Sequence, residues 1–182
     1  SVSFAPSYPQ VMYLMVEAAA RETEDGGEEP LSGLYRSVDG GENWEQVNTF
    51  NSRPFYYSQV RVDPADPDRV YFSSLRFTTD GGRTAATAGQ AVHVDYHAIW
   101  IDPGDGEHLI AGTDAGLYES FDQGTTWRHF PNLPISQFYK LALDTTEPFY
   151  NIMGGAQDLG TLIGPSRTTN TEGVRNQDWF VP

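Results

Sequence analysis

Short apolar segments alternate with polar turns along this chain, and the pattern is clearest between residues 97 and 130. There the segments HAIWI, HLIAG, LYESF and WRHF are separated by DPGDGE, TDAG and DQGTT. Runs of four or five residues with β-branched and aromatic side chains, bounded by Gly, Pro and Asp, are typical of strands. The connections are too short for the helix of a parallel crossover, so four antiparallel strands are predicted here.

The same pattern recurs along the chain. Asp39, Asp80 and Asp122 stand in similar turns at intervals of 41 and 42 residues. A second motif recurs at a similar interval. Its copies are FAPSYPQVMYLMV, VDPADPDRVYFSS, IDPGDGEHLIAGT and, more weakly, LDTTEPFYNIMGG. Four strands in a repeat of about 40 residues are the signature of a β-propeller blade. We therefore predict an all-β fold of about four four-stranded antiparallel blades, with a β-sandwich as the alternative.

The repeat gives approximate blade boundaries at residues 1–57, 58–92, 93–135 and 136–182. Residues 17–33 lengthen the first unit with mostly charged side chains and are expected to form a surface loop, with a brief helical turn possible over residues 18–22. Ser, Thr and Asn punctuate residues 164–182 and obscure the fourth Asp-containing turn, so the last blade is expected to be incomplete.

The recurring turn has a sequence motif of Ser or Thr, followed by Asp, Gly and Trp at a fixed spacing. Gly supplies positive φ without steric cost, and the Asp carboxylate accepts hydrogen bonds from turn amides. The Trp ring that follows can pack on a neighbouring sheet. Because Ala85 stands where the Trp would be, we expect the second unit to be packed less tightly. The predicted structural residues are Ser37, Asp39, Gly41, Trp44, Asp80, Gly82, Ser120, Asp122, Gly124 and Trp127.

These turns, together with the phrases GLYRSVDGGENW, HVDYHAIWIDP and LIAGTDAGLYESFDQGTTW, resemble the Asp-box, or bacterial neuraminidase repeat, β-propeller superfamily. The chain is most similar to its sortilin-type and xyloglucanase-like bacterial branches. The resemblance covers nearly the whole chain. It implies a propeller of six to ten blades of which this chain is a part, with a four-bladed ring as the alternative. It also implies an extracytoplasmic location, either secreted or periplasmic.

The formal charge of −14 disfavours nucleic acid and anionic lipid surfaces as partners, because like charges repel. The chain has no cysteine, so burial and hydrogen bonds must hold the fold together. The apolar runs are shorter than the roughly 20 residues that a membrane-spanning helix needs. No membrane span is therefore predicted.

The most suggestive polar pattern is VHVDYHAIW, because His93, Asp95 and His97 alternate and point to one face of a strand. Such a stripe suits a wet channel wall that binds a polar ligand. A divalent metal on these three side chains is the alternative. We predict no metal and no cofactor.

By the repeat register, several polar side chains belong to corresponding turns of successive blades and are expected to meet at one channel mouth. The alternative is that each caps only its own turn. The predicted ligand-binding residues are His97, Asp95, Asp114, Gln137, Tyr139, Gln157, Asp158 and Tyr57.

The sequence contains no Gly-rich phosphate loop leading into a helix, no Ser nucleophile elbow and no Cys nucleophile. We therefore predict a non-catalytic interaction module that binds a protein or glycan, and one option is that it is a subunit of a larger complex. The alternative is a fragment of a xyloglucanase-like glycoside hydrolase with paired Asp residues. Catalytic residues are not identified.

Overall fold

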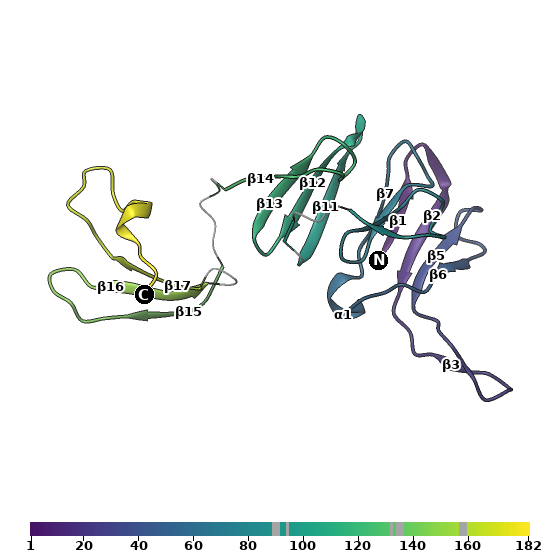
Figure 1. Cartoon of the computed structure of the whole chain (residues 1–182), viewed down its shortest axis with the longest axis horizontal. Coiled ribbons are helices and arrows are strands. Elements are labelled where there is room, and N and C mark those ends of the chain that lie inside the picture. The colour runs from purple at the N-terminus through teal and green to yellow at the C-terminus, as the bar shows by residue number, and fades with distance from the viewer. Residues whose placement is uncertain (89–91, 94, 132, 134–136, 157–159) are drawn as a thin grey trace. The chain divides into compact units, whose positions relative to one another are not determined.

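The computed structural model describes residues 1–88, 92–93, 95–131, 133, 137–156 and 160–182, and these are almost entirely β-strand and turn (Figure 1). The chain divides into two compact units, Ser1–Pro131 and Asn132–Pro182. Each unit is described by itself.

The first unit contains three four-stranded sheets, each with its strands antiparallel and in chain order. Sheet 1 is formed by β1 (Val2–Ala5), β2 (Tyr8–Val16), β5 (Gly33–Ser37) and β6 (Glu45–Asn48). Sheet 2 is formed by β7 (Val60–Val62), β8 (Val70–Phe72), β9 (Arg76–Thr78) and β10 (Ala86–Thr87). Sheet 3 is formed by β11 (Tyr96–Asp102), β12 (Asp105–Thr113), β13 (Gly116–Ser120) and β14 (Arg128–His129).

The second unit contains one sheet of three strands, β15 (Phe138–Leu143), β16 (Asn151–Ala156) and β17 (Gly160–Pro165). Within the described residues, the place of a fourth strand is taken only by an isolated bridge between Ile163 and Phe180, which follows the 3₁₀ turn η1 (Asn176–Asp178). The sheet of the last repeat therefore has three strands, whereas the sheets of the first three repeats have four.

The charged insertion in sheet 1 differs from its prediction. Instead of a helical turn over residues 18–22, it forms a two-stranded hairpin of β3 (Arg21–Glu22) and β4 (Glu28–Glu29). Arg21 forms an ion pair with Glu29 directly across this hairpin, and Thr23 and Asp25 hydrogen-bond within its turn. Cross-strand pairing of opposite charges thus outweighs the helix propensity of the three alanines before it.

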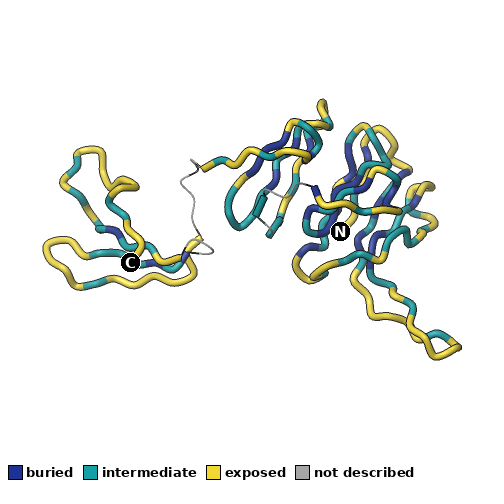
Figure 2. The backbone as a smooth tube through the Cα atoms, viewed as in Figure 1, coloured by how far each residue is buried: buried dark blue, intermediate teal, exposed yellow. Residues whose placement is uncertain are grey.

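Two apolar clusters hold the first unit together. Sheets 1 and 2 share one that includes Tyr13, Leu34 and Val60, and sheets 2 and 3 share another that includes Tyr71 and Leu109. Figure 2 shows buried backbone along the central strands of this unit. Sheet 2 is covered on both sides, which buries all three residues of β8.

Ala85, the residue in place of the Trp, is partly buried and packs against the cluster between sheets 1 and 2. Looser packing of the second unit stays a prediction.

The three Asp-containing turns share one hydrogen-bond pattern. In the third turn, Ser120 Oγ donates to Asp122 Oδ1 at 2.8 Å and accepts from the Gly124 amide at 2.8 Å. Asp122 then accepts from the amide and the hydroxyl of Thr126 at 2.8 and 2.6 Å. The turns after β5 and β9 repeat this arrangement around Asp39 and Asp80.

Candidate functional site

The order of the antiparallel strands separates two kinds of connection in the first unit. The Pro turns and the Asp turns lie at one end of each sheet. The turns between second and third strands, and the links from one sheet to the next, lie at the other, which we call the connection end. Helix α1 (Pro54–Tyr57) and the β3–β4 hairpin project from this end (Figure 1).

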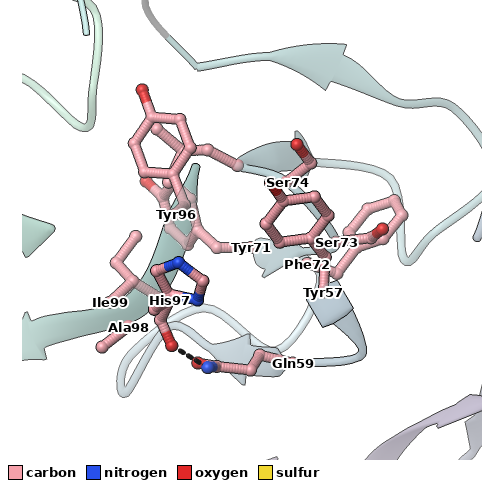
Figure 3. A pocket seen from close by; sticks show the side chains of 11 residues that line it. Tyr57, Gln59, Tyr71, Phe72, Ser73, Ser74, Tyr96, His97, Ala98 and Ile99 are labelled. Carbon is pink, nitrogen blue, oxygen red and sulfur yellow. Dashed lines mark hydrogen bonds between the residues drawn. The ribbon is translucent and has the colours of Figure 1, made fainter. Parts of the chain in front are cut away.

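A polar cluster lies at the connection end. The Tyr57 hydroxyl donates to Asp95 Oδ1, and the imidazole of His97 lies 2.8 Å from Asp114 Oδ1 through Nε2. The Gln59 side-chain amide donates to the backbone carbonyl of His97 (Figure 3). The link that contains α1 supplies Tyr57 and Gln59, the segment before β11 supplies Asp95, the turn after β12 supplies Asp114, and His97 stands on β11 itself.

The backbone beside this cluster is strained. Ser73, Ser74 and Leu75 are three consecutive non-glycine residues with φ of 27°, 54° and 54°, and Arg53 at the start of α1 has φ of 48°. Left-handed conformations cost free energy for residues with a Cβ. They persist where the surrounding structure stabilises them, and they are concentrated at functional sites.

Ser73, Ser74 and Leu75 line a small pocket together with Tyr57 and His97 (Figure 3). Its cavity of about 20 Å³ has room for about one water molecule and is too small for a sugar ring. A larger ligand would therefore have to bind on the surface beside the pocket.

Exposed rings surround the pocket on that surface. Phe55 is 81% exposed, Tyr56 is exposed, and the imidazole of His97 is partly exposed. The ring centroids of Tyr56 and His97 are 4.8 Å apart with an edge-to-face geometry, and Tyr56 packs on Tyr57 in the same way at 4.7 Å. We call Phe55, Tyr56 and His97 the aromatic ledge.

The structure brings together four of the eight predicted ligand-binding residues, Tyr57, Asp95, His97 and Asp114. Gln137 and Tyr139 belong to the second compact unit and not to the first, which contains the cluster. Gln157 and Asp158 lie outside the described residues.

The metal alternative on His93, Asp95 and His97 finds no support, because the described residues contain no group of three or more His, Asp or Glu side chains that could hold a metal ion. Asp95 and His97 instead bind Tyr57 and Asp114.

No protein-family model and no curated protein matches the chain. Among solved structures, the GH74 enzyme of Niastella koreensis aligns with 99% of this chain at 15% identity and a TM-score of 0.58. The GH74 xyloglucanase of Xanthomonas campestris aligns with 91% at 17% identity and a TM-score of 0.51. The fold is that of a β-propeller. This chain spans 29% and 28% of the length of those two proteins. Because a propeller blade is a four-stranded antiparallel sheet, sheets 1 to 3 are three blades.

The described part of the propeller module contains no helix that is long and apolar enough to cross a membrane.

A second polar cluster, which the sequence analysis missed, lies on blade 3. His108 lies between Asp102, 3.4 Å from Nδ1, and Glu119, 3.1 Å from Nε2, and Glu119 also forms an ion pair with Arg128. The ring of Phe121 stacks on His108 at 4.6 Å. The residues come from four strands and one turn, and the pairing of β11 with β12, β12 with β13 and β13 with β14 makes them neighbours.

We expect the pKa of His108 to lie above its ordinary value of 6.5. Burial alone would lower it, but the hydrogen bonds to Glu119 and Asp102 outweigh that effect. A raised pKa stabilises the folded state below the unfolded pKa, and this contribution disappears as pH rises through the folded value. NMR titration of the His108 ring protons measures it directly. A midpoint at or below 6.5 would contradict the cluster geometry.

Proposed function

We propose that this propeller module binds a protein or glycan ligand at the connection end of its blades and does not hydrolyse it. The aromatic ledge carries the proposal, because its exposed rings lie beside the polar cluster, where Tyr56 contacts His97 and Tyr57. Such a surface offers flat apolar contact and hydrogen-bonding groups side by side, which is the usual composition of a binding site.

The second part of the proposal concerns the carboxylates. Glycoside hydrolysis by two carboxyl groups needs one that stays protonated near neutral pH and so has a raised pKa. Among the described residues, the carboxyl groups with shifted pKa values are all shifted downward: Asp25, Asp39, Asp80, Asp102, Glu119, Asp122 and Asp144. None of these seven is therefore the protonated acid that this mechanism needs.

We further propose that the chain belongs to the Asp-box propellers, near the sortilin-type and xyloglucanase-like branches, and that it works outside the cytoplasm as one subunit of a larger complex. The shared hydrogen-bond pattern around Asp39, Asp80 and Asp122 supports the family. The location is an expectation from the resemblance alone.

A xyloglucanase-like hydrolase is the second candidate, and the fold likeness to GH74 structures favours it. It requires a pair of carboxylates on either side of an open cleft, separated by roughly 5–10 Å. Asp95 and Asp114 are the carboxylates of the polar cluster, where Asp95 accepts from the Tyr57 hydroxyl and Asp114 lies 2.8 Å from His97 Nε2. Release of reducing sugar from xyloglucan would therefore favour this candidate over the binding module.

The binding proposal is tested by calorimetric titration with xyloglucan oligosaccharides and, separately, with a lysine-rich peptide that complements the acidic chain. We expect one of the two probes to bind without release of product. Replacing Phe55 by alanine should weaken that binding about 2- to 10-fold, because an aromatic contact contributes roughly 0.5–1.5 kcal/mol beyond area burial.

Tyr8→Ala is the matched control, since Tyr8 is also an exposed ring but lies beside the Pro turn at the opposite end of blade 1. It should bind as the unaltered chain does. The proposal fails if neither probe binds, or if Phe55→Ala and Tyr8→Ala reduce the affinity equally.

A further inference from the structure

The charged insertion of blade 1 forms an acidic arm at the connection end. We give this name to residues 17–32, which include the β3–β4 hairpin and contain six carboxylates and one arginine. Its two legs are joined at the base, where the Ser32 hydroxyl donates to the Ala18 carbonyl and accepts from the Ala18 amide, both at 2.9 Å. The Gln46 side chain donates to the carbonyls of Pro30 and Ser32 at 3.0 Å. Hydrogen bonds therefore attach the arm to the blade at its base.

The base of the arm lies against the link that carries the aromatic ledge. Asn51 Nδ2 donates to the Val16 carbonyl at 2.7 Å, directly before the first leg begins. At the end of the other leg, a Cβ on Gly33 would clash with the carbonyl oxygen of Asn48, so the two backbones are in direct contact there. Because the link from Asn48 leads into α1, the arm and the ledge begin next to one another at the same end of the blade (Figure 1).

One face of the arm carries like charges directly opposite one another. In the register of the hairpin, Glu22 is paired with Glu28 and Arg21 with Glu29. Successive residues of a strand point to opposite faces, so the ion pair of Arg21 with Glu29 neutralises one face only. Within the described residues Glu22 and Glu28 have no basic partner, and like charges in this position destabilise a hairpin. A cation bound between them would relieve the repulsion.

The rings of the aromatic ledge also suit a cation, because the face of an aromatic ring attracts Lys and Arg side chains. The chain itself contains such a contact at the connection end, where the guanidinium carbon of Arg76 lies 4.5 Å from the centroid of the Phe50 ring. Phe55 belongs to the same link as Phe50 and is 81% exposed. Arg53 at the start of α1 is a single positive charge, and the six carboxylates of the arm outnumber it.

We propose that the acidic arm and the aromatic ledge together bind a cationic segment of a partner protein. Lys or Arg side chains of that segment lie on the exposed rings and between the carboxylates of Glu22 and Glu28. The charge of the arm also steers the segment toward the connection end before contact. A neutral glycan would leave the repulsion across the arm unrelieved, so the observations favour a protein segment. This inference rests on the proposed function, because it names the partner of the same surface.

Calorimetric titration of the triple variant Glu22→Gln, Glu24→Gln, Glu28→Gln with the lysine-rich peptide tests the proposal. These three side chains are exposed, while Asp25 and Glu29 keep their contacts within the hairpin. The variant should bind the peptide about 3- to 10-fold more weakly at low ionic strength, since each exposed charge contributes modestly to affinity. Raising the ionic strength from about 0.01 M to about 0.15 M should weaken binding by the unaltered chain more than binding by the variant.

The triple variant Glu42→Gln, Glu45→Gln, Glu107→Gln is the matched control. It removes the same charge from exposed carboxyls that lie beside the Asp turn of blade 1 and the Pro turn of blade 3, at the opposite end of the blades. It should bind the peptide as the unaltered chain does. Both variants should keep the circular dichroism of the parent, because none of the replaced carboxyls forms an ion pair in the described part of the chain.

An arm variant that binds the peptide as tightly as the parent overturns the proposal. An equal loss in the two triple variants also overturns it, because binding would then depend on the overall charge and not on the arm. If xyloglucan oligosaccharides bind and the lysine-rich peptide does not, this inference fails and the proposed function stands. If neither probe binds, both fail.

Discussion

Replacing Leu109 by alanine is expected to lower the free energy of unfolding by about 3 kcal/mol, within the 2–5 kcal/mol range for buried Leu→Ala changes. Leu109 is 0% exposed on β12 and packs with Tyr71, Leu75 and Ile101 in the cluster between blades 2 and 3. The truncation removes the apolar contacts of the side chain and leaves a cavity that packed sheets cannot collapse to fill. Urea unfolding followed by tryptophan fluorescence measures the change.

Leu117→Ala is the control for this prediction. Leu117 lies on the neighbouring strand β13, is 38% exposed, and points to the opposite face of the sheet from Leu109. Its truncation should cost less than about 1 kcal/mol, because the side chain loses little buried area. Equal losses for the two variants would show that the assignment of the buried face of blade 3 is wrong.

Stability is expected to fall steeply as pH decreases from about 4 to about 2. The pKa values of Asp39 and Asp80 are lowered from 3.8 to about 2, and that of Asp122 is lowered as well. For Asp80 the largest cause is the hydrogen bond from the Thr78 hydroxyl, followed by the Thr84 amide. A carboxyl with a lowered folded pKa stabilises the protein above its unfolded pKa, and this contribution is lost as pH falls through the folded value.

Asp80→Asn isolates one of these turns. The variant should be less stable at neutral pH, because a neutral amide accepts hydrogen bonds less strongly than a carboxylate does. It should also lose less stability between pH 4 and pH 2, since one titrating group has been removed. Urea unfolding at a series of pH values measures both effects. Glu42→Gln, at an exposed carboxyl of the first Asp turn, should leave the pH profile unchanged, and an equal change in both variants would refute the assignment.

Much of the fold follows from local chemistry that is visible in the sequence. The apolar runs predicted the strands of the first three blades, and the spacing of Asp39, Asp80 and Asp122 predicted the repeat. Gly41, Gly82 and Gly124 all have positive φ, which explains why glycine recurs at that position of the turn. The prediction of a helical turn in the insertion was wrong because these residues pair across the β3–β4 hairpin. A local helix propensity does not include such cross-strand contacts.

The candidate site depended on contacts between residues far apart in the chain. The repeat register indicated that Asp114 and His97 belong to one end of the blades, but Tyr57 and Asp95 meet across 38 residues of sequence. The left-handed turn at Ser73, Ser74 and Leu75 contains no glycine, so no local feature of the sequence predicted it. The cluster around His108 likewise needed the pairing of β12 with β13 before its members became neighbours.

The sequence by itself determined the strands, the turns and their repetition, because each depends on the backbone preferences and hydrogen bonds of a few consecutive residues. Only the tertiary structure decided which apolar faces are buried and which polar side chains meet at the connection end. Leu109 and Leu117 carry the same side chain on neighbouring strands of blade 3. Their burial differs because Leu109 packs against blade 2, whereas Leu117 points to the opposite face of the sheet.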